Sequence, residues 1–246
     1  MRKLDPEEIK EVQAILFRML CTFKEICDAE GLWYSLAYGT MLGAVREKGF
    51  IPWDDDVDVY MMLPDREKFR EAFEKYSHEG LVLQKMGVDR KYTKSHDKIC
   101  YTLSQKYKIQ LDIYTLIGAP SDARERTRFM WVNRISDKLF RAKYNKLKDS
   151  TPKHKPFLLF VRFVDLFIPD RLITRIHERR ESRYDIDKSE YLITLIDRPR
   201  AKGCTHRRMF SSTVEREFNG VMFRIPAGWD EYLALYYDDY MIPRKD

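Results

Sequence analysis

Apolar residues recur every three or four positions along residues 5–30, which predicts an amphipathic helix with one buried face. Asp5 is suited to cap the start of this helix, Pro6 to take its first position and Gly31 to end it. The apolar positions are Ile9, Val12, Ile15, Leu16, Met19, Leu20, Phe23 and Cys27. We therefore expect a first helix that packs on a core.

Short apolar stretches rich in β-branched and aromatic residues follow this helix and predict strands. A second helix, opened by Pro64 and Asp65, is predicted among them. The expected strands are 33–38, 56–61, 81–84, 99–103 and 110–116. This order predicts an α+β fold, a small mixed sheet with flanking helices.

The pattern changes after residue 120, where helices with long basic faces are predicted up to about residue 183. Asn219-Gly220 predicts a turn that leads into a strand at 218–225, and residues 226–240 contain a predicted terminal helix. We therefore expect a catalytic core at residues 1–120. A mostly helical extension at residues 121–246 should pack on the core as one compact unit.

The composition is that of a folded protein, because 44% of the 246 residues are hydrophobic and 13% are aromatic. The longest apolar run, residues 157–168, contains Arg162 and Asp165 and is shorter than the roughly 20 residues that span a bilayer. The chain starts with a charged helix instead of an apolar leader, so we expect a cytoplasmic protein. Four scattered cysteines are expected to be core thiols.

Positive charge is concentrated between residues 124 and 155, which carry eleven Lys/Arg and three Asp/Glu, whereas the whole chain has a net charge of +6. Such a segment can bind a nucleotide, a lipid phosphate or an anionic membrane, and it is equally compatible with a solvated helix surface. Residues 157–176 are apolar at helical spacing beside several arginines, which favours either burial in the core or a helix lying on a membrane surface.

Four aspartates occur within five positions, Asp54, Asp55, Asp56 and Asp58. At this density their charges repel one another unless a cation lies among them. If residues 56–61 form a strand, Asp56 and Asp58 project from the same side, about 6.6 Å apart. Two carboxylates fixed in this way suit a hard divalent cation, Mg²⁺ or Mn²⁺ in its place.

A third acid, Asp112, lies between Leu111 and Ile113 in an apolar strand, where an unpaired carboxylate is unfavourable. We expect it to complete the metal site from a neighbouring strand. Two alternatives fit less well. An EF-hand loop would need Gly where Val59 stands and Glu where Asp65 stands, and an Asp-rich turn explains Asp54 and Asp55 but not Asp58.

Gly39 and Thr40 follow the first predicted strand and can form a tight turn whose N–H groups and hydroxyl hold a phosphate. Arg46, Lys48 and Lys98 are cations that could balance a bound diphosphate, and Arg46 is favoured because it lies between the two motifs. The spacing fits neither a Walker loop nor a dinucleotide fingerprint. Cys204 and His206 are half of a zinc pattern with no second pair.

Three stretches resemble the LicD family of phosphotransferases, which includes bacterial phosphorylcholine transferases and is related to the fukutin-type ribitol-phosphate transferases. Residues 38–61, YGTMLGAVREKGFIPWDDDVDVYM, resemble the family signature. Residues 111–116, LDIYTL, resemble its third-acid strand, and residues 225–243, IPAGWDEYLALYYDDYMIP, resemble its closing segment. One departure is Asp238, where the family often has Gly.

The resemblance implies a nucleotidyltransferase-like fold with a helical C-terminal extension. Gly39 and Thr40 would contact the donor phosphates, Asp56 and Asp58 would bind the metal, and Asp112 would be the third acid. Asp54 matches the first acid of the run.

The implied reaction is a metal-dependent transfer of a phospho-alcohol, phosphorylcholine from CDP-choline, to a hydroxyl of a cell-surface glycan or its lipid-linked precursor, with release of CMP. The acceptor could be lipopolysaccharide, teichoic acid or capsule, and the enzyme could contact the inner face of the membrane. Two alternatives remain: a nucleotidyltransferase that releases pyrophosphate, and a non-enzymatic protein that binds anionic ligands or membranes. Nucleic acid binding is not expected, because no base-reading motif accompanies the basic segment.

Overall fold

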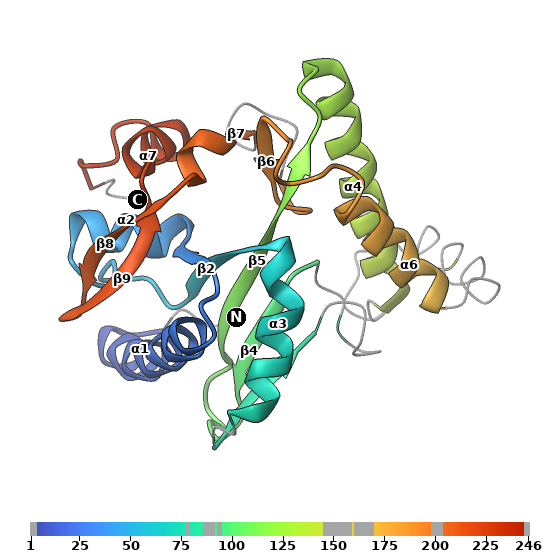
Figure 1. Ribbon diagram of the computed structural model, residues 1–246. Coiled ribbons are helices and arrows are strands. Elements are labelled where there is room, and N and C mark those ends of the chain that lie inside the picture. Colours follow the sequence, from blue (N-terminus) through green and yellow to red (C-terminus); the bar gives the residue numbers. More distant parts are fainter. Residues whose placement is uncertain are drawn as a thin grey trace. The chain divides into compact units, whose positions relative to one another are not determined.

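The computed structural model describes residues 4–76, 79–85, 92, 95–144, 159, 170–197 and 204–243. The chain forms two compact units (Figure 1). Unit 1 is made of residues 1–83, 97–116 and 205–246, and unit 2 of residues 84–96 and 117–204. All candidate site residues fall in unit 1. Residues 205–246 group with the first 83 residues, whereas the sequence analysis placed a single boundary at residue 120.

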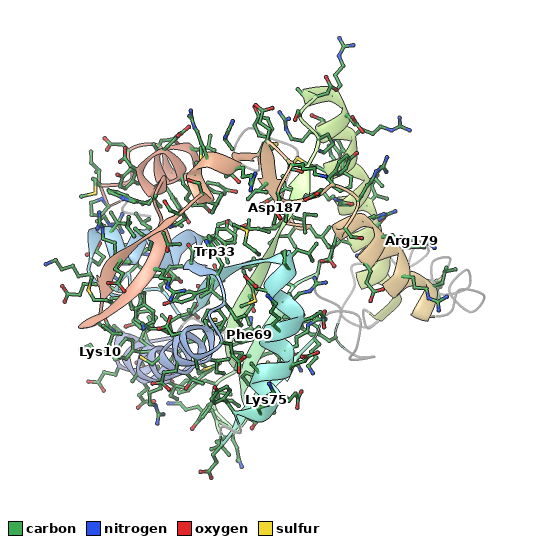
Figure 2. The ribbon with its side chains drawn as sticks, in the orientation of Figure 1. Lys10, Trp33, Phe69, Lys75, Arg179 and Asp187 are labelled. Carbon is green, nitrogen blue, oxygen red and sulfur yellow. The ribbon has the colours of Figure 1, made fainter. Side chains whose placement is uncertain are left out.

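Helix α1 (Pro6–Ala29) begins and ends where the sequence predicted. The Asp5 side chain accepts hydrogen bonds from the N–H groups of Glu7 and Glu8, and the Glu8 carboxylate accepts from the Asp5 N–H, so a capping box closes the first turn. Gly31, with φ of 63°, follows the last turn in the left-handed conformation that glycine favours. The buried face of α1 contributes Phe23, whose ring packs on that of Phe69. Figure 2 labels Phe69 among the side chains.

A mixed sheet forms the centre of unit 1, with strand order β1-β2-β5-β4-β3. The pair β2–β5 is parallel, whereas β1–β2 and β4–β5 are antiparallel. The strands are β1 (Tyr34–Leu36), β2 (Val57–Met62), β3 (Leu81–Gln84), β4 (Asp97–Tyr101) and β5 (Ile109–Ala119). The sheet and its flanking helices confirm the α+β fold class.

Several strand boundaries differ from the prediction: β1 is shorter than 33–38, β4 lies two residues earlier than 99–103, and the bounds of β2 and β5 also change. Strand β2 begins at Val57, where its pairing with Leu111 begins, so Asp56 precedes the strand instead of lying in it. Strand β5 continues three residues further than predicted, because Ile117 to Ala119 pair with β6 (Tyr191–Ile193).

Helix α2 (Tyr38–Arg46) occupies the region for which the sequence analysis predicted a turn at Gly39-Thr40. Both residues lie in its first turn, directly after β1. Helix α3 (Leu63–Lys75) was predicted from Pro64 and Asp65, and it is joined to β4 by a buried two-point ion pair. Arg70 Nε and Nη2 each lie 2.6 Å from one of the two carboxylate oxygens of Asp97.

The C-terminal segment of unit 1 contains β7 (Thr205–His206), the 3₁₀ helix η4 (Arg207–Phe210), β8 (Thr213–Phe218), β9 (Val221–Pro226) and α7 (Trp229–Tyr237). Strands β8 and β9 form a hairpin whose turn, Asn219-Gly220, has positive φ at both residues, as a type I′ turn requires. The single strand predicted at 218–225 is thus the end of one hairpin strand and most of the other. The predicted terminal helix is confirmed as α7.

Unit 2 contains helices α4 (Ala123–Tyr144) and α6 (Asp170–Glu181) and strand β6. Buried polar groups lie among these elements: Ser95 donates a hydrogen bond to Asp137, and Asn133 and His177 are also buried. Of the basic segment 124–155, residues 145–155 lie outside the described residues, as does most of the apolar stretch 157–176. None of the helices described combines the length and apolar character that crossing a bilayer requires.

Candidate functional site

Three charged residues lie side by side on adjacent strands of unit 1. Asp58 on β2 is in register with Asp112 on β5, which is in register with Lys98 on β4. Residues paired in this way project from the same face of a sheet. Lys98 Nζ lies 3.0 Å from Asp112 Oδ1, and both side chains are almost fully buried. Asp112 thus lies on the strand next to that of Asp58, as the sequence analysis expected, while its part in a metal site stays a prediction.

The opposite face of the same strands is apolar. Val57, Val59 and Leu111 are completely buried in the core, and Ile113 is 1% exposed. This alternation follows from the strand period of two, because one face must carry the acids if the other packs on the core. The core therefore fixes the position of Asp58 and Asp112 through their immediate neighbours.

Asp54 and Asp56 approach the same place from the segment before β2. Burial, followed by the charge of Asp56, raises the pKa of Asp54 to about 7. Burial also raises the pKa of Asp56. The pKa of Asp58 lies well above its ordinary value, first because of burial and then because of the charges of Asp56 and Asp112, while Lys98 opposes the shift. Asp54, Asp56, Asp58 and Asp112 therefore influence one another electrostatically, and the repulsion expected within the run from Asp54 to Asp58 is joined by the charge of Asp112.

This donor set fits a divalent cation that is shared with a substrate. Carboxylate oxygens are the ligands that Mg²⁺ and Mn²⁺ prefer, and a cation would relieve the repulsion among the acids. Among the residues described, no three His, Cys, Asp or Glu side chains are grouped as a complete metal-binding set. Mg²⁺ is usually held by one or two carboxylates together with water and substrate phosphates, so a partial protein shell suits it.

The first turn of α2 is fixed beside the acids by hydrogen bonds to Asp58. Thr40 Oγ1 accepts a hydrogen bond from the Asp58 N–H at 2.9 Å, and the Ala37 N–H donates to the Asp58 carbonyl at 3.0 Å. A Cβ at Gly39 would lie only 3.0 Å from Asp54 Oδ2, so glycine allows the turn to approach the acids closely. The N-terminus of a helix has unpaired N–H groups and favours phosphate.

The three candidate cations lie in different surroundings, and Lys48 is an exposed side chain whose Nζ lies 3.8 Å from the carboxylate of Glu217. Lys98 is within the site, paired with Asp112. Arg46, at the other end of α2, directs Nη1 to the Tyr240 carbonyl at 3.0 Å and Nε to Glu47 at 2.7 Å. In this structure Arg46 ties α2 to the segment after α7, and its proposed role toward a diphosphate stays a prediction.

Comparison with known proteins identifies the family. The LicD/FKTN/FKRP nucleotidyltransferase-domain model matches residues 31–152, which include every candidate site residue. The lipopolysaccharide cholinephosphotransferase LicD of Haemophilus influenzae is 26% identical over 98% of this chain and 93% of its own length. The chain belongs to the LicD family.

An uncharacterized protein of Rickettsia prowazekii, RP689, is also similar, at 25% identity over 56% of this chain and 41% of its own length. As a member of the LicD family, the protein is an enzyme of the phosphotransferase class.

Tyrosines that the sequence analysis did not single out also border this LicD-family site. Burial, and then the charges of Asp58 and Asp112, raise the pKa of Tyr114, which lies two residues beyond Asp112 on β5. Burial, and then the charges of Asp58 and Asp54, raise the pKa of Tyr237 on α7. The strand period could have revealed Tyr114, because residues 112 and 114 share a face. The sequence analysis gave Tyr237 no part in the site and treated its segment only as the family's closing stretch.

Proposed function

We propose that this LicD-family enzyme transfers phosphorylcholine from CDP-choline to a hydroxyl of a cell-surface glycan or its lipid-linked precursor. The acceptor oxygen forms a bond to the phosphorus that bears choline, the bond from that phosphorus to the CMP oxygen breaks, and the hydroxyl proton leaves to a base. The observation that carries the proposal is the register of Asp58 with Asp112 beside the first turn of α2. The choice of choline is supported by the similar Haemophilus cholinephosphotransferase.

The residues of the chain have distinct roles in this proposal. The N–H groups of the first α2 turn bind the donor diphosphate, and Gly39 leaves room for it. Thr40 holds the backbone of Asp58. Asp112, beside Lys98, receives the proton of the acceptor hydroxyl, which is the usual contribution of a general base. Asp54 lies in the segment before β2 and adds its carboxylate to the acid cluster.

Asp56 and Asp58 would hold Mg²⁺, or Mn²⁺ in its place, together with the donor phosphates. A bound cation neutralises the charge that develops on the diphosphate as CMP leaves. Asp112, in register with Asp58 on the adjacent strand, would be a further ligand of the cation.

The exposed side of α4 in unit 2 supports contact with an anionic membrane, the place of a lipid-linked acceptor. Trp131 is 49% exposed and Ile135 is 52% exposed, with arginines at helical spacing on the same side. A basic and apolar helix face that includes Trp binds the interface of an anionic bilayer. The face contains Arg124, Arg128, Trp131, Val132 and Ile135. We place the enzyme in the cytoplasm, at the inner face of the membrane.

Vesicle flotation tests this contact. The protein should bind vesicles that contain phosphatidylglycerol and not vesicles of phosphatidylcholine alone. Trp131→Ser with Ile135→Ser should weaken binding at least about tenfold, because two apolar side chains that the bilayer interface would bury are lost. Met222→Ser, which changes an equally exposed apolar residue on β9, should not. Equal binding by all three proteins would refute the membrane contact.

The second candidate is a nucleotidyltransferase that releases pyrophosphate, which the name of the matching family model favours. Product analysis separates the two. The enzyme is incubated with Mg²⁺ and either CDP-choline or CTP, together with a lipopolysaccharide acceptor, and CMP and pyrophosphate are measured. CMP from CDP-choline supports the proposal, whereas pyrophosphate from CTP supports the second candidate.

Asp58→Asn tests the assignment of the site within the same assay. It should lower turnover by about 10³-fold or more, because the amide cannot replace a metal-binding carboxylate in the transition state. The fold should be kept, since Asn removes a charge from a repelling cluster. Glu25→Gln on the exposed side of α1 is the matched control. Wild-type turnover in Asp58→Asn would refute the site.

A further inference from the structure

Four tyrosines with partly exposed side chains lie in and around the acid cluster of unit 1. The acids act electrostatically on Tyr114 and Tyr237, and Tyr38 and Tyr236 pack beside these two rings. The ring of Tyr38 lies between two of the others. Its centroid is 5.2 Å from that of Tyr114, with the rings perpendicular, and 5.6 Å from that of Tyr236. Helix α2, strand β5 and helix α7 therefore each contribute an aromatic ring to one wall. We call Tyr38, Tyr114 and Tyr236 the tyrosine wall.

Buried tyrosines of the core of unit 1 pack against the tyrosine wall. Tyr236 stacks on the completely buried Tyr232, with centroids 4.5 Å apart and an interplanar angle of 23°. The hydroxyl oxygens of Tyr232 and Tyr60 lie 2.7 Å apart and share a hydrogen bond. The ring of Tyr60 also packs against that of Tyr38. One face of Tyr236 is thus covered by protein, and the wall is held in place by the core of unit 1.

Tyr38 has a backbone conformation that is unusual for a large side chain. Its φ is 41°, in the left-handed region, although it is the first residue of α2 and is followed by Gly39. Non-glycine residues in this region are strained, and such strain is found preferentially where it positions a functional group. Here the strained residue is the one whose ring joins Tyr114 to Tyr236.

The acids give the wall a negative environment. Asp112 and Tyr114 project from the same face of β5, and Tyr60, beside Tyr38, is in register with Tyr114. Asp58, Asp112 and Asp56 all act electrostatically on Tyr114. A cation over the aromatic rings is therefore attracted both by the ring faces and by nearby carboxylates.

We propose that the tyrosine wall is the subsite for the quaternary ammonium of choline, a binding site that rests on the proposed transfer of phosphorylcholine. A trimethylammonium group has no N–H to donate, so carboxylates alone recognise it poorly, whereas aromatic faces bind it well. Two carbons and one oxygen separate its nitrogen from the phosphorus. A choline phosphate held at the acids therefore places its ammonium within reach of tyrosines that border them.

Leucine and phenylalanine variants of Tyr236 and Tyr114 test the subsite by donor selectivity. The kcat/KM for CDP-choline should fall about 5- to 30-fold in Tyr236→Leu and Tyr114→Leu, the range that a cation–π contact contributes. It should change less than about threefold in the Phe variants, which keep the ring. The kcat/KM for CDP-ethanolamine, whose ammonium has N–H donors, should fall much less than that for CDP-choline.

The control is Tyr76→Leu, which removes a partly exposed tyrosine at the end of α3. CMP affinity and melting temperature of every variant are measured in parallel. Leu variants that keep their melting temperature but lose affinity for CMP as much as for CDP-choline would show that the wall stacks on cytosine. That outcome would overturn the proposal, as would unchanged selectivity.

Binding of choline and of tetramethylammonium, followed by calorimetry with Mg²⁺ and CMP present, separates this proposal from the proposed function. If wild type binds both cations and the Leu variants do not, the subsite stands even where CDP-choline is not turned over. If wild type turns over CDP-choline while Leu and Phe variants bind choline equally, the reaction stands and the subsite is refuted. If wild type binds neither cation, the subsite is refuted whatever the turnover.

Discussion

Lys98 and Asp112 form a buried ion pair, 3.0 Å from Nζ to Oδ1, in a row that continues to Asp58 on the next strand. Lys98 is 3% exposed and its positive charge opposes the repulsion among the acids. The pair therefore stabilises the site before any substrate or cation is bound. It also keeps the carboxylate of Asp112 in a fixed place on β5.

Removing this charge should destabilise the protein. Lys98→Met leaves buried carboxylates without their cation, which costs about 3–5 kcal/mol where a buried pair is broken. Added Mg²⁺ should raise the melting temperature of Lys98→Met more than that of wild type, because it replaces the lost charge. Thermal unfolding with and without Mg²⁺ measures both effects. Lys98→Arg, which keeps the charge, is the control. Equal melting temperatures for wild type, Lys98→Arg and Lys98→Met would contradict the stabilising role of the Lys98–Asp112 pair.

Replacing each of two glycines of α2, Gly39 and Gly43, by alanine should have different effects on stability and turnover. A Cβ at Gly43 would lie 2.4 Å from the backbone carbonyl oxygen of Gly49, which cannot move away easily. Gly43→Ala should therefore lower stability by about 1–3 kcal/mol, although alanine is the better helix former. At Gly39 the new Cβ meets a carboxylate end at 3.0 Å, so the fold should survive while turnover falls. Melting temperature and kcat of both variants check this contrast, and it fails if Gly39→Ala is the less stable protein.

Arg70 and Asp97 should prove to be structural partners. Their two hydrogen bonds of 2.6 Å join α3 to β4, the strand that carries Lys98, and Asp97 is 1% exposed. Arg70→Met should cost about 3–5 kcal/mol of unfolding free energy, because Asp97 is left as a buried charge. Urea denaturation of the single variants and of Arg70→Met with Asp97→Leu measures the coupling. If the double variant loses as much unfolding free energy as the two single variants together, the coupling between Arg70 and Asp97 is contradicted.

His177 in unit 2 should make stability depend on pH. Burial, followed by the charge of Arg180, lowers the pKa of His177, while Asp137 opposes this shift. The unfolded chain then binds a proton near pH 6.5 that the folded chain does not yet bind, so stability falls as the pH decreases below about 6.5. The loss ends once the pH is below the folded pKa.

His177→Gln should lose less stability than wild type between pH 7.5 and pH 5.5. Urea unfolding at both pH values, with His206→Gln on β7 as the matched control, measures the difference. An identical loss in wild type and His177→Gln would show that other groups cause the acid sensitivity.

The sequence predicted those parts of the fold that depend on local signals. The Asp5 cap, the Asn219-Gly220 turn and the alternation of Val57 and Val59 with acids are each specified by residues close in the chain. The parallel pairing of β2 with β5 is not specified by neighbouring residues, because about fifty residues separate the two strands. The proposal that Asp112 joins Asp58 therefore needed a physical argument, the unfavourable burial of a lone acid.

The remaining differences also have physical reasons. Gly39-Thr40 looked like a loop because Ala37, the N-cap of α2, provides no side-chain cap and Tyr38, its first residue, has a strained backbone. Arg46 was favoured for its position along the chain, but one of its two hydrogen bonds is to the carbonyl of residue 240, far from it in sequence, and the other is to Glu47. The tyrosine wall was missed because aromatic residues at such positions usually fill a core.

The division of unit 1 into three chain segments has a consequence for biosynthesis. Residues 205–246, which supply Tyr236 and Tyr237, are translated about ninety residues after β5. A ribosome that has just completed β5 has therefore made all the acids and none of the α7 tyrosines beside them. Donor selection by the wall must await the last part of the chain, so a nascent or prematurely terminated product would have the acids without the full wall that we propose selects the choline donor.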